Sequence, residues 1–145
     1  MSDKTFLQWP FFETRHRKLA QDIDAWAASH IAELTAKEHV DLDGTCRALV
    51  RGLGNAGWTR YAVPASGGGL LENLDVRSLC LIRETLGRYH ALADFAFAMQ
   101  GLGSGPLSLF GTPQQRRRYL GSDQRQRRAQ PGQPRAVIGG RQDDS

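Results

Sequence analysis

The sequence predicts an all-α fold, and two observations lead to this prediction. Between residues 12 and 120, apolar residues recur at steps of three, four and seven, the spacing of one face of an α-helix. No segment of that region alternates between apolar and polar residues for long enough to indicate a strand. With 145 residues, 40% of them hydrophobic, the chain is long enough to bury a core of its own. We therefore expect a helical array over residues 12–120, preceded by an N-terminal extension of residues 1–11.

Two helices are expected in the first half of the chain. The first covers residues 12–34, and its apolar stripe contains Phe12, Leu19, Ile23, Trp26, Ile31 and Leu34. The second covers about residues 43–56, with Asp41 or Asp43 as the N-cap. Its stripe is formed by Cys46, Leu49, Val50 and Leu53.

Residues 57–72 contain three consecutive glycines and are expected to form a loop. Such a run could cradle a phosphate, or it could be a flexible surface turn. No strand precedes it and no Lys-Ser/Thr pair follows it, so the nucleotide-binding pattern is incomplete. The surface turn is the better interpretation.

Three further helices are expected in the second half. One covers about residues 75–89, with Leu79, Ile82, Leu86 and Tyr89 on one face, and the next begins near Ala91. Only Asp94 and Gln100 interrupt the apolar run of residues 91–103, which predicts a helix buried on all sides and the most buried element of the fold. The alternative is a helix left uncovered on one side for lack of a β-domain against it, with an exposed apolar patch that favours self-association or aggregation. Gly101, Gly103, Gly105 and Pro106 would strain its C-terminal half, and Asp94 would pair with Arg83 or Arg88. The last helix begins with Thr112 as N-cap and Pro113 in its first turn, and reaches Leu120.

The charge distribution argues against a nucleic-acid partner. Residues 1–120 hold 14 Lys and Arg against 12 Asp and Glu, a net charge of only +2. The basic run at residues 116–118 has no interleaved aromatic residues for base stacking, so a solvated helix face is the better interpretation. No apolar run is long enough for a membrane span, and no secretory signal is recognisable.

The few cysteines and histidines suggest neither a metal site nor a catalytic site. Cys46 and Cys80 lack metal-ligand spacing and are expected to be buried thiols in a reducing cytoplasm. None of the four histidines has a recognisable nucleophile or metal partner in the sequence: His16, His30, His39 and His90. His16 and His30 lie on or beside the apolar stripe of the first helix. We therefore expect both to flank the core without a catalytic or metal-binding role.

The composition changes at Gly121. Residues 121–145 are rich in Arg, Gln, Gly and Pro, contain no aromatic residue, and have a single apolar pair, Val137-Ile138. Because such a segment buries too little surface to offset its ordering entropy, we expect a disordered tail.

Three blocks of the sequence resemble the N-terminal helical domain of acyl-CoA dehydrogenases. The first is GWTRYAVPASGGGL at residues 57–70, and the second is LDVRSLCLIRETLGR at residues 74–88. The third is GLGSGPLSLFGTPQQRRRYL at residues 101–120, which is similar to the family's signature of a glycine followed by Gln, two basic residues and Tyr-Leu. The order and spacing of the three blocks agree with the family over about residues 12–120.

The resemblance implies an oxidoreductase that uses FAD to oxidise the α,β bond of acyl-CoA thioesters. In this family the helical domain packs against a β-domain and a C-terminal helical domain, which hold the flavin and the catalytic carboxylate. The helical domain supplies one wall of the acyl pocket, which the resemblance places on Phe95, Ala98, Met99 and Leu102. Ordinary core packing is an equally good interpretation of these four residues.

The chain departs from the family after Leu120. The Gly121-Ser122-Asp123 sequence is not preceded by the family's Thr-Glu-Pro, so no flavin contact is assigned to it. The tail has the composition of a GC-rich gene read out of frame, and truncation or a frameshift is our hypothesis. We therefore expect a chain without a catalytic residue, a flavin site or a metal site, inactive by itself. A homo-oligomer or the missing dehydrogenase domains are its expected partners, and a non-enzymatic helical interaction module that assembles with a separate partner is the alternative.

Overall fold

The structure is a computed structural model that describes residues 4–120. Five α-helices form in this part of the chain: α1 (Thr14–Thr35), α2 (Leu42–Asn55), α3 (Val76–Tyr89), α4 (Ala91–Phe110) and α5 (Pro113–Tyr119). Three short 3-10 segments accompany them: η1 (Thr5–Gln8), η2 (Trp58–Ala62) and η3 (Ala65–Gly67). No strand forms among residues 4–120, which confirms the predicted all-α class. The expected disorder of residues 121–145 falls outside the described residues.

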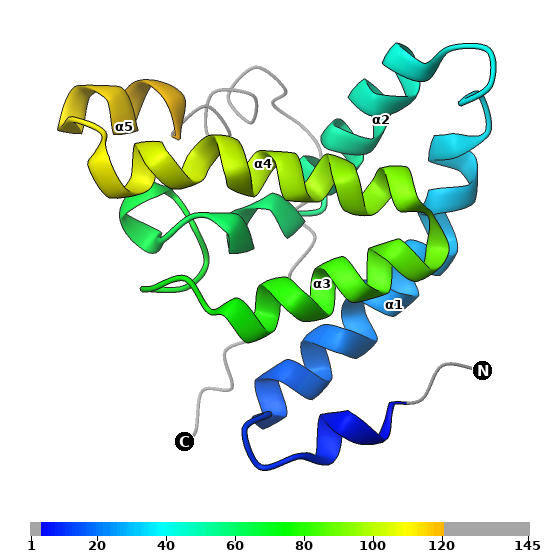
Figure 1. The fold of residues 1–145 in the computed structure, drawn as a ribbon, viewed down its shortest axis with the longest axis horizontal. Helices are drawn as coiled ribbons and strands as arrows, with labels where there is room; N and C mark the ends of the chain where they lie inside the picture. Colours follow the sequence, from blue (N-terminus) through cyan, green and yellow to red (C-terminus); the bar gives the residue numbers. More distant parts are fainter. Residues whose placement is uncertain (1–3, 121–145) are drawn as a thin grey trace, which may run out of the picture.

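Helices α1 to α4 pack against one another. Helix α3 packs against α1 on one side and against α4 on the other, while α2 contacts both α1 and α4. Figure 1 shows α3 against α1, α4 above α3 in this view, and α5 folded back at the C-terminal end of α4. Segment η2 follows α2 in the chain and lies against both α2 and α4.

The core lies where the inward stripes of the first four helices meet. Ile23, Leu49, Leu53, Ile82 and Leu86 are completely buried there. All five belong to the stripes that the helical periodicity predicts. Burial of such side chains stabilises the fold by roughly 1.5–3 kcal/mol each, so this region carries most of the hydrophobic stabilisation.

Each helix of the described part starts at a polar residue that accepts or exchanges a hydrogen bond with the first turn. The Asp41 carboxylate accepts from the Gly44 N–H at 2.8 Å, which identifies Asp41 rather than Asp43 as the N-cap of α2. Thr112 and Gln115 form a capping box on α5, with Pro113 in its first turn as predicted. Helix α1 begins at Thr14, so Phe12 precedes it and packs on the side chain of Phe6.

Helix α4 extends further than the apolar run of residues 91–103. It continues through Gly101, Gly103, Gly105 and Pro106 and ends at Phe110. The hydroxyl of Ser104 donates to the Ala62 carbonyl oxygen at 3.2 Å, which ties the second half of α4 to η2. This hydrogen bond is one contact that holds the second half of α4, a segment of low helix propensity, against η2.

The expectation that both thiols are buried is wrong. Cys80 is exposed on α3, and Cys46 is partly buried on α2. Position 80 falls on the side of α3 opposite to Ile82 and Leu86, so the amphipathic pattern of the helix turns this thiol outward. Among the helices of residues 4–120, none is long and apolar enough to cross a membrane.

Candidate functional site

The outward face of α4 carries a stripe of apolar side chains. Phe95 is 58% exposed, Met99 43% and Leu102 67%, and Ala98 lies beside them, partly buried. Leu109 and Phe110 continue the same face to the C-terminal end of the helix. We call these residues the α4 stripe: Phe95, Ala98, Met99, Leu102, Leu109 and Phe110.

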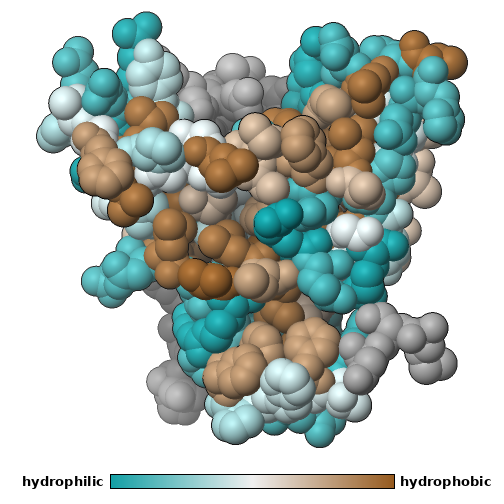
Figure 2. All heavy atoms as spheres, viewed as in Figure 1, coloured by the Kyte–Doolittle hydropathy of each residue, from teal (hydrophilic) through white to brown (hydrophobic). Residues whose placement is uncertain are grey.

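Two further residues interrupt the bulky side chains of the α4 stripe. Gly103 and Pro106 fall on the same face, between Leu102 and Leu109. Figure 2 shows apolar side chains gathered on the visible face over α4 and over the segment below its C-terminal half. The four residues assigned to an acyl-pocket wall therefore lie together on an open surface of the described chain.

The prediction that residues 91–103 are buried on all sides is wrong. Only Ala93, Ala96 and Phe97 are buried in α4, whereas α1 and α3 each bury five residues. The small side chains of Ala93 and Ala96 let α4 approach the core, while Phe95 points away from it. An all-round apolar pattern shows that a helix has a second apolar face, but it does not show what covers that face. Ordinary core packing is accordingly the wrong interpretation of Phe95, Met99 and Leu102.

The only carboxylate on α4 is bound by an arginine of the preceding helix. Arg83 donates from Nε to Asp94 Oδ1 at 2.8 Å and from Nη2 to Oδ2 at 2.9 Å. The hydrogen bonds that Arg83 donates to Asp94 raise the pKa of the Arg83 guanidinium above its ordinary value. Of the two partners that the sequence suggested, Arg83 is confirmed; Arg88 instead contacts Glu84 and Asp24. Asp94 therefore links α4 to α3. Both of its carboxylate oxygens accept hydrogen bonds from Arg83, so it is not free to act as a general base.

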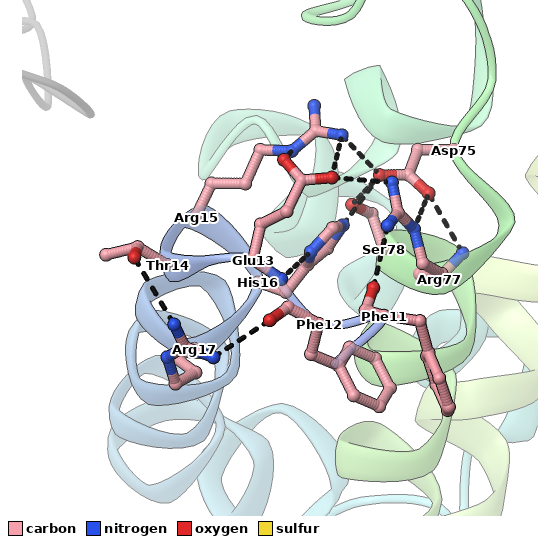
Figure 3. A network of polar contacts seen from close by, with 10 residues as sticks. All are labelled: Phe11, Phe12, Glu13, Thr14, Arg15, His16, Arg17, Asp75, Arg77 and Ser78. Atoms are coloured by element: carbon pink, nitrogen blue, oxygen red, sulfur yellow. Dashed lines mark hydrogen bonds and ion pairs between the residues drawn. The ribbon is translucent and has the colours of Figure 1, made fainter. Parts of the chain in front are cut away.

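A second cluster of polar side chains joins the start of α1 to the start of α3. His16 is completely buried, and its Nε2 lies 2.7 Å from Asp75 Oδ2. Its Nδ1 accepts the Glu13 N–H at 3.0 Å, which leaves the ring proton on Nε2, pointing at the carboxylate. Figure 3 shows Arg15 and Arg77 on either side of Asp75, with Arg15 at 3.2 Å and Arg77 at 3.1 Å. We call this group the His16–Asp75 junction.

The junction holds Asp75 as a carboxylate. Burial by itself raises the pKa of Asp75, but hydrogen bonds from His16 and from the Arg77 side chain and N–H outweigh it. The pKa of this group therefore lies well below its ordinary value of 3.8. Arg77 also donates to the Phe11 carbonyl oxygen at 2.7 Å and pairs with Glu13 at 3.0 Å, so the segment before α1 is held to α3.

The geometry of the junction fits a structural role and does not fit nucleophilic catalysis. The Ser78 hydroxyl lies 3.3 Å from Asp75 Oδ2 and donates to it, so it is oriented toward the carboxylate and not toward His16. In a nucleophile–base pair the hydroxyl must donate to the imidazole instead. The His16–Asp75 junction could not be predicted from the sequence. Glu13 and His16 have the spacing of a capping box but not its usual residue types, and the contact with Asp75, 59 residues away, leaves no local sign in the sequence.

The amide groups of residues 67–70 in the glycine-rich turn already donate to carbonyl oxygens of the chain. The N–H groups of Gly67, Gly68, Gly69 and Leu70 donate to the carbonyl oxygens of Pro64, Ala65, Pro64 and Arg60, respectively. The Arg60 side chain in turn donates to the Gly68 carbonyl oxygen at 3.1 Å. A phosphate cradle requires amides that converge on open space. The surface turn is therefore the better interpretation, and this turn is closed by its own hydrogen bonds; its expected flexibility stays a prediction.

The other chemical candidates do not come together in the part of the chain that the structure describes. No group of three or more His, Cys, Asp or Glu side chains there is arranged to hold a metal ion. His90 caps α4 through Nδ1, which accepts the Leu92 N–H at 3.2 Å, and its Nε2 contacts Glu38 at 3.0 Å. His30 stacks on the Trp26 ring, with centroids 5.1 Å apart. Both histidines therefore have structural partners.

Comparison with known proteins agrees with the fold and with the motif blocks. The model of the acyl-CoA dehydrogenase N-terminal domain matches residues 13–122, about three quarters of the 145 residues. No curated protein matches the chain. The matched range contains all five helices, the glycine-rich turn and the α4 stripe. The chain therefore belongs to the acyl-CoA dehydrogenase family, through its N-terminal domain.

Proposed function

We propose that the α4 stripe forms one wall of the acyl-chain pocket of an FAD-dependent acyl-CoA dehydrogenase. Phe95, Ala98, Met99 and Leu102 are the residues that contact the acyl chain in this proposal. The observation that carries it is the exposure of Phe95, Met99 and Leu102 on a single face of a helix whose other side is held firmly in the core. A pocket wall needs such a face, because it must be rigid and apolar while remaining open to a ligand.

The chemistry of the stripe suits an alkyl chain. Each CH2 group that leaves water for an apolar surface contributes about 0.8 kcal/mol to binding. No charged side chain lies among the stripe residues, and the nearest carboxylate on α4, Asp94, is neutralised by Arg83. The domain would thus bind the acyl chain, orient it and exclude water from it. It would not supply the group that moves a proton.

FAD belongs to the full-length enzymes of this family, and residues 4–120 do not fit a flavin site by themselves. The glycine-rich turn would be the natural place for a diphosphate, but its four consecutive amides donate to backbone carbonyls. Asp94 is engaged by Arg83, and Asp75 lies in the His16–Asp75 junction. We therefore assign no flavin contact and no catalytic carboxylate to the described residues.

Photoaffinity labelling of the full chain tests the proposal. The probe is a long-chain acyl-CoA with a diazirine near the end of its acyl group. Trypsin cuts after Arg88 and Arg116 and not between them, so a single peptide carries the whole stripe. We expect label in that peptide, suppressed by excess unlabelled acyl-CoA but not by free CoA. The variant Leu102→Gln should lower the labelling several-fold, while Leu42→Gln, which changes an exposed leucine of α2, should not.

Label that is absent from residues 89–116, or that free CoA removes as well as acyl-CoA does, would contradict the pocket wall. The alternative is then a non-enzymatic helical module whose exposed α4 face binds a separate protein. The same exposure of Phe95 and Leu102 supports this alternative. The acyl-CoA competition separates the two functions, because a protein-binding face gains nothing from an alkyl chain of a particular length.

A further inference from the structure

The α4 stripe has a shape that fits a second copy of itself. Its bulky exposed residues lie in two groups, with Phe95, Met99 and Leu102 in one and Leu109 and Phe110 in the other. Gly103, which has no side chain, and Pro106, which has only its compact ring, lie between the two groups. We call the surface over these two residues the low region. A Cβ atom added at Gly103 would meet no atom within 4 Å, so the surface above this glycine is open.

We propose that the domain forms a two-fold dimer in which the α4 helices of two copies pack antiparallel through this stripe. A two-fold axis that passes between Leu102 and Gly103 places Leu102 of one copy opposite Gly103 of the other. The same axis places Met99 opposite Pro106 and Phe95 opposite Phe110. Each large side chain of the first group thus meets either the low region or the aromatic end of the second copy. Such self-complementarity is what a two-fold interface requires.

The charges on and beside the α4 stripe are compatible with packing of two copies through it. A two-fold axis brings equal residues near one another, so any charge on the stripe would face a like charge. The stripe, together with Gly103 and Pro106, contains no ionisable side chain. Asp94 and Arg83 lie at its border and neutralise each other. Packing of the two helices therefore meets no electrostatic penalty from the residues that it brings together.

The size of the stripe is sufficient for a weak but specific dimer. Phe110 is 85% exposed and Leu109 66%, and with Phe95, Met99 and Leu102 they offer on the order of 500 Å2 per copy, given that an aromatic side chain carries about 150–250 Å2. Two copies would bury about 1,000 Å2, near the lower limit of specific interfaces. We expect a dissociation constant in the micromolar range.

The chain's own tail is a poor substitute for the second copy. Residues 121–145 contain no aromatic residue and only one apolar pair, Val137-Ile138. A segment of that composition cannot cover a stripe that contains two phenylalanines, a methionine and two leucines. The dimer goes beyond the proposed pocket wall, since an acyl chain and a second copy would compete for the same face.

Sedimentation velocity of the full chain without any acyl-CoA tests the dimer. Between about 1 and 100 µM, the unmodified chain should pass from monomer to dimer, with no larger species. Leu102→Gln removes the central apolar contact, and Gly103→Leu fills the low region. Both variants should weaken dimerisation at least tenfold while leaving thermal unfolding nearly unchanged, because both positions are exposed. Leu42→Gln should dimerise like the unmodified chain.

Disulfide trapping tests the register. In a background with Cys46→Ser and Cys80→Ser, Leu102→Cys lies next to the axis and should give a cross-linked dimer on mild oxidation. Leu109→Cys is the matched control. It lies about 10 Å along the helix from the axis, so the two copies of this thiol would be about 20 Å apart, beyond disulfide reach.

Three outcomes would overturn the proposal. These are a chain that stays monomeric at 100 µM, open-ended aggregates, and a dimer that Leu102→Gln does not weaken. A chain that stays monomeric can still be labelled by the acyl-CoA probe, and a chain that dimerises without acyl-CoA can still fail to be labelled, so failure of the dimer and failure of the pocket wall can be told apart.

Discussion

The imidazole of His16 and the carboxylate of Asp75 meet at 2.7 Å and fasten the first turn of α1 to the N-cap of α3. His16 is completely buried, and the Asp75 side chain is only 11% exposed. Asp75 also caps its own helix by accepting the Arg77 N–H at 3.1 Å. The Asp75 carboxylate therefore accepts hydrogen bonds both from the first turn of α3 and from a buried histidine that lies 59 residues away.

Replacing this carboxylate should cost more than the loss of an ordinary helix cap. Asp75→Ala removes the cap and leaves the buried Nε2–H of His16 without its acceptor, so we expect a loss of about 3 kcal/mol in the free energy of unfolding. Asp41→Ala is the matched control: it removes an exposed aspartate cap from α2, and should cost about 1 kcal/mol. Urea denaturation measures both. Equal losses in the two variants would show that the bond to His16 adds nothing.

Acid should weaken the fold through Asp75. Its pKa in the folded chain lies below the ordinary value of 3.8, so the folded state binds fewer protons than the unfolded chain in this range. The stabilisation is fully present above the unfolded pKa and is lost as the pH falls from about 4 toward the folded pKa. The urea midpoint of the unmodified chain should drop over this interval. In Asp75→Asn the drop should be smaller; an equal drop in both proteins would assign the acid sensitivity to other carboxylates, such as Glu13 and Asp24, whose pKa values are also lowered.

The turn before α3 should tolerate no side chain at Gly69. A Cβ atom there would collide with the Val63 carbonyl oxygen, which is backbone and cannot move aside. We expect Gly69→Ala to destabilise the domain by about 2 kcal/mol or more. Gly87→Ala is the control, and here the free energy of unfolding should rise. Its Cβ would meet only Asp94 Cβ at 3.8 Å, an ordinary van der Waals contact. It should raise stability by about 0.5–1 kcal/mol through better helix propensity. A Gly69→Ala variant as stable as the parent would mean that the turn is not closed as described.

The chain by itself should neither bind FAD stoichiometrically nor oxidise an acyl-CoA. The described residues provide no open amide cradle, and Asp94 and Asp75 are both engaged by cationic or hydrogen-bonding partners. Misplacing catalytic groups by about 1 Å can cost on the order of a hundredfold in rate, so a domain without them should show no turnover. The measurement is an absorbance titration with FAD, followed by a series of acyl-CoA substrates with an artificial electron acceptor. Stoichiometric flavin binding with substrate-dependent bleaching would refute this prediction.

The local features of the fold could be predicted because they depend on neighbouring residues. The stripe of α2 follows from the spacing of Leu49 and Leu53, both completely buried. The start of α5 follows from Thr112 and Pro113, whose roles in capping are set within one helical turn. The motif blocks also identified the family, because they preserve the order and spacing of such local features.

The candidate site could be predicted only in part. The resemblance placed Phe95, Met99 and Leu102 on one face of a helix, and the helix and the shared face are present. Whether that face is covered depends on which segments pack beside α4. An apolar pattern alone is compatible with both states, and the prediction of full burial was therefore wrong.

By itself, the sequence determined the all-α class, the family, and the positions of the five helices to within two residues, apart from the C-terminal end of α4. Local propensity and periodicity are sufficient for these features. The tertiary structure alone decided that His16 pairs with Asp75, that Arg83 rather than Arg88 holds Asp94, and that Phe95 faces outward while Phe97 is buried. Each of these outcomes is a contact between segments that are distant along the chain or a consequence of how two helices cross, and such relationships exist only once the chain has folded.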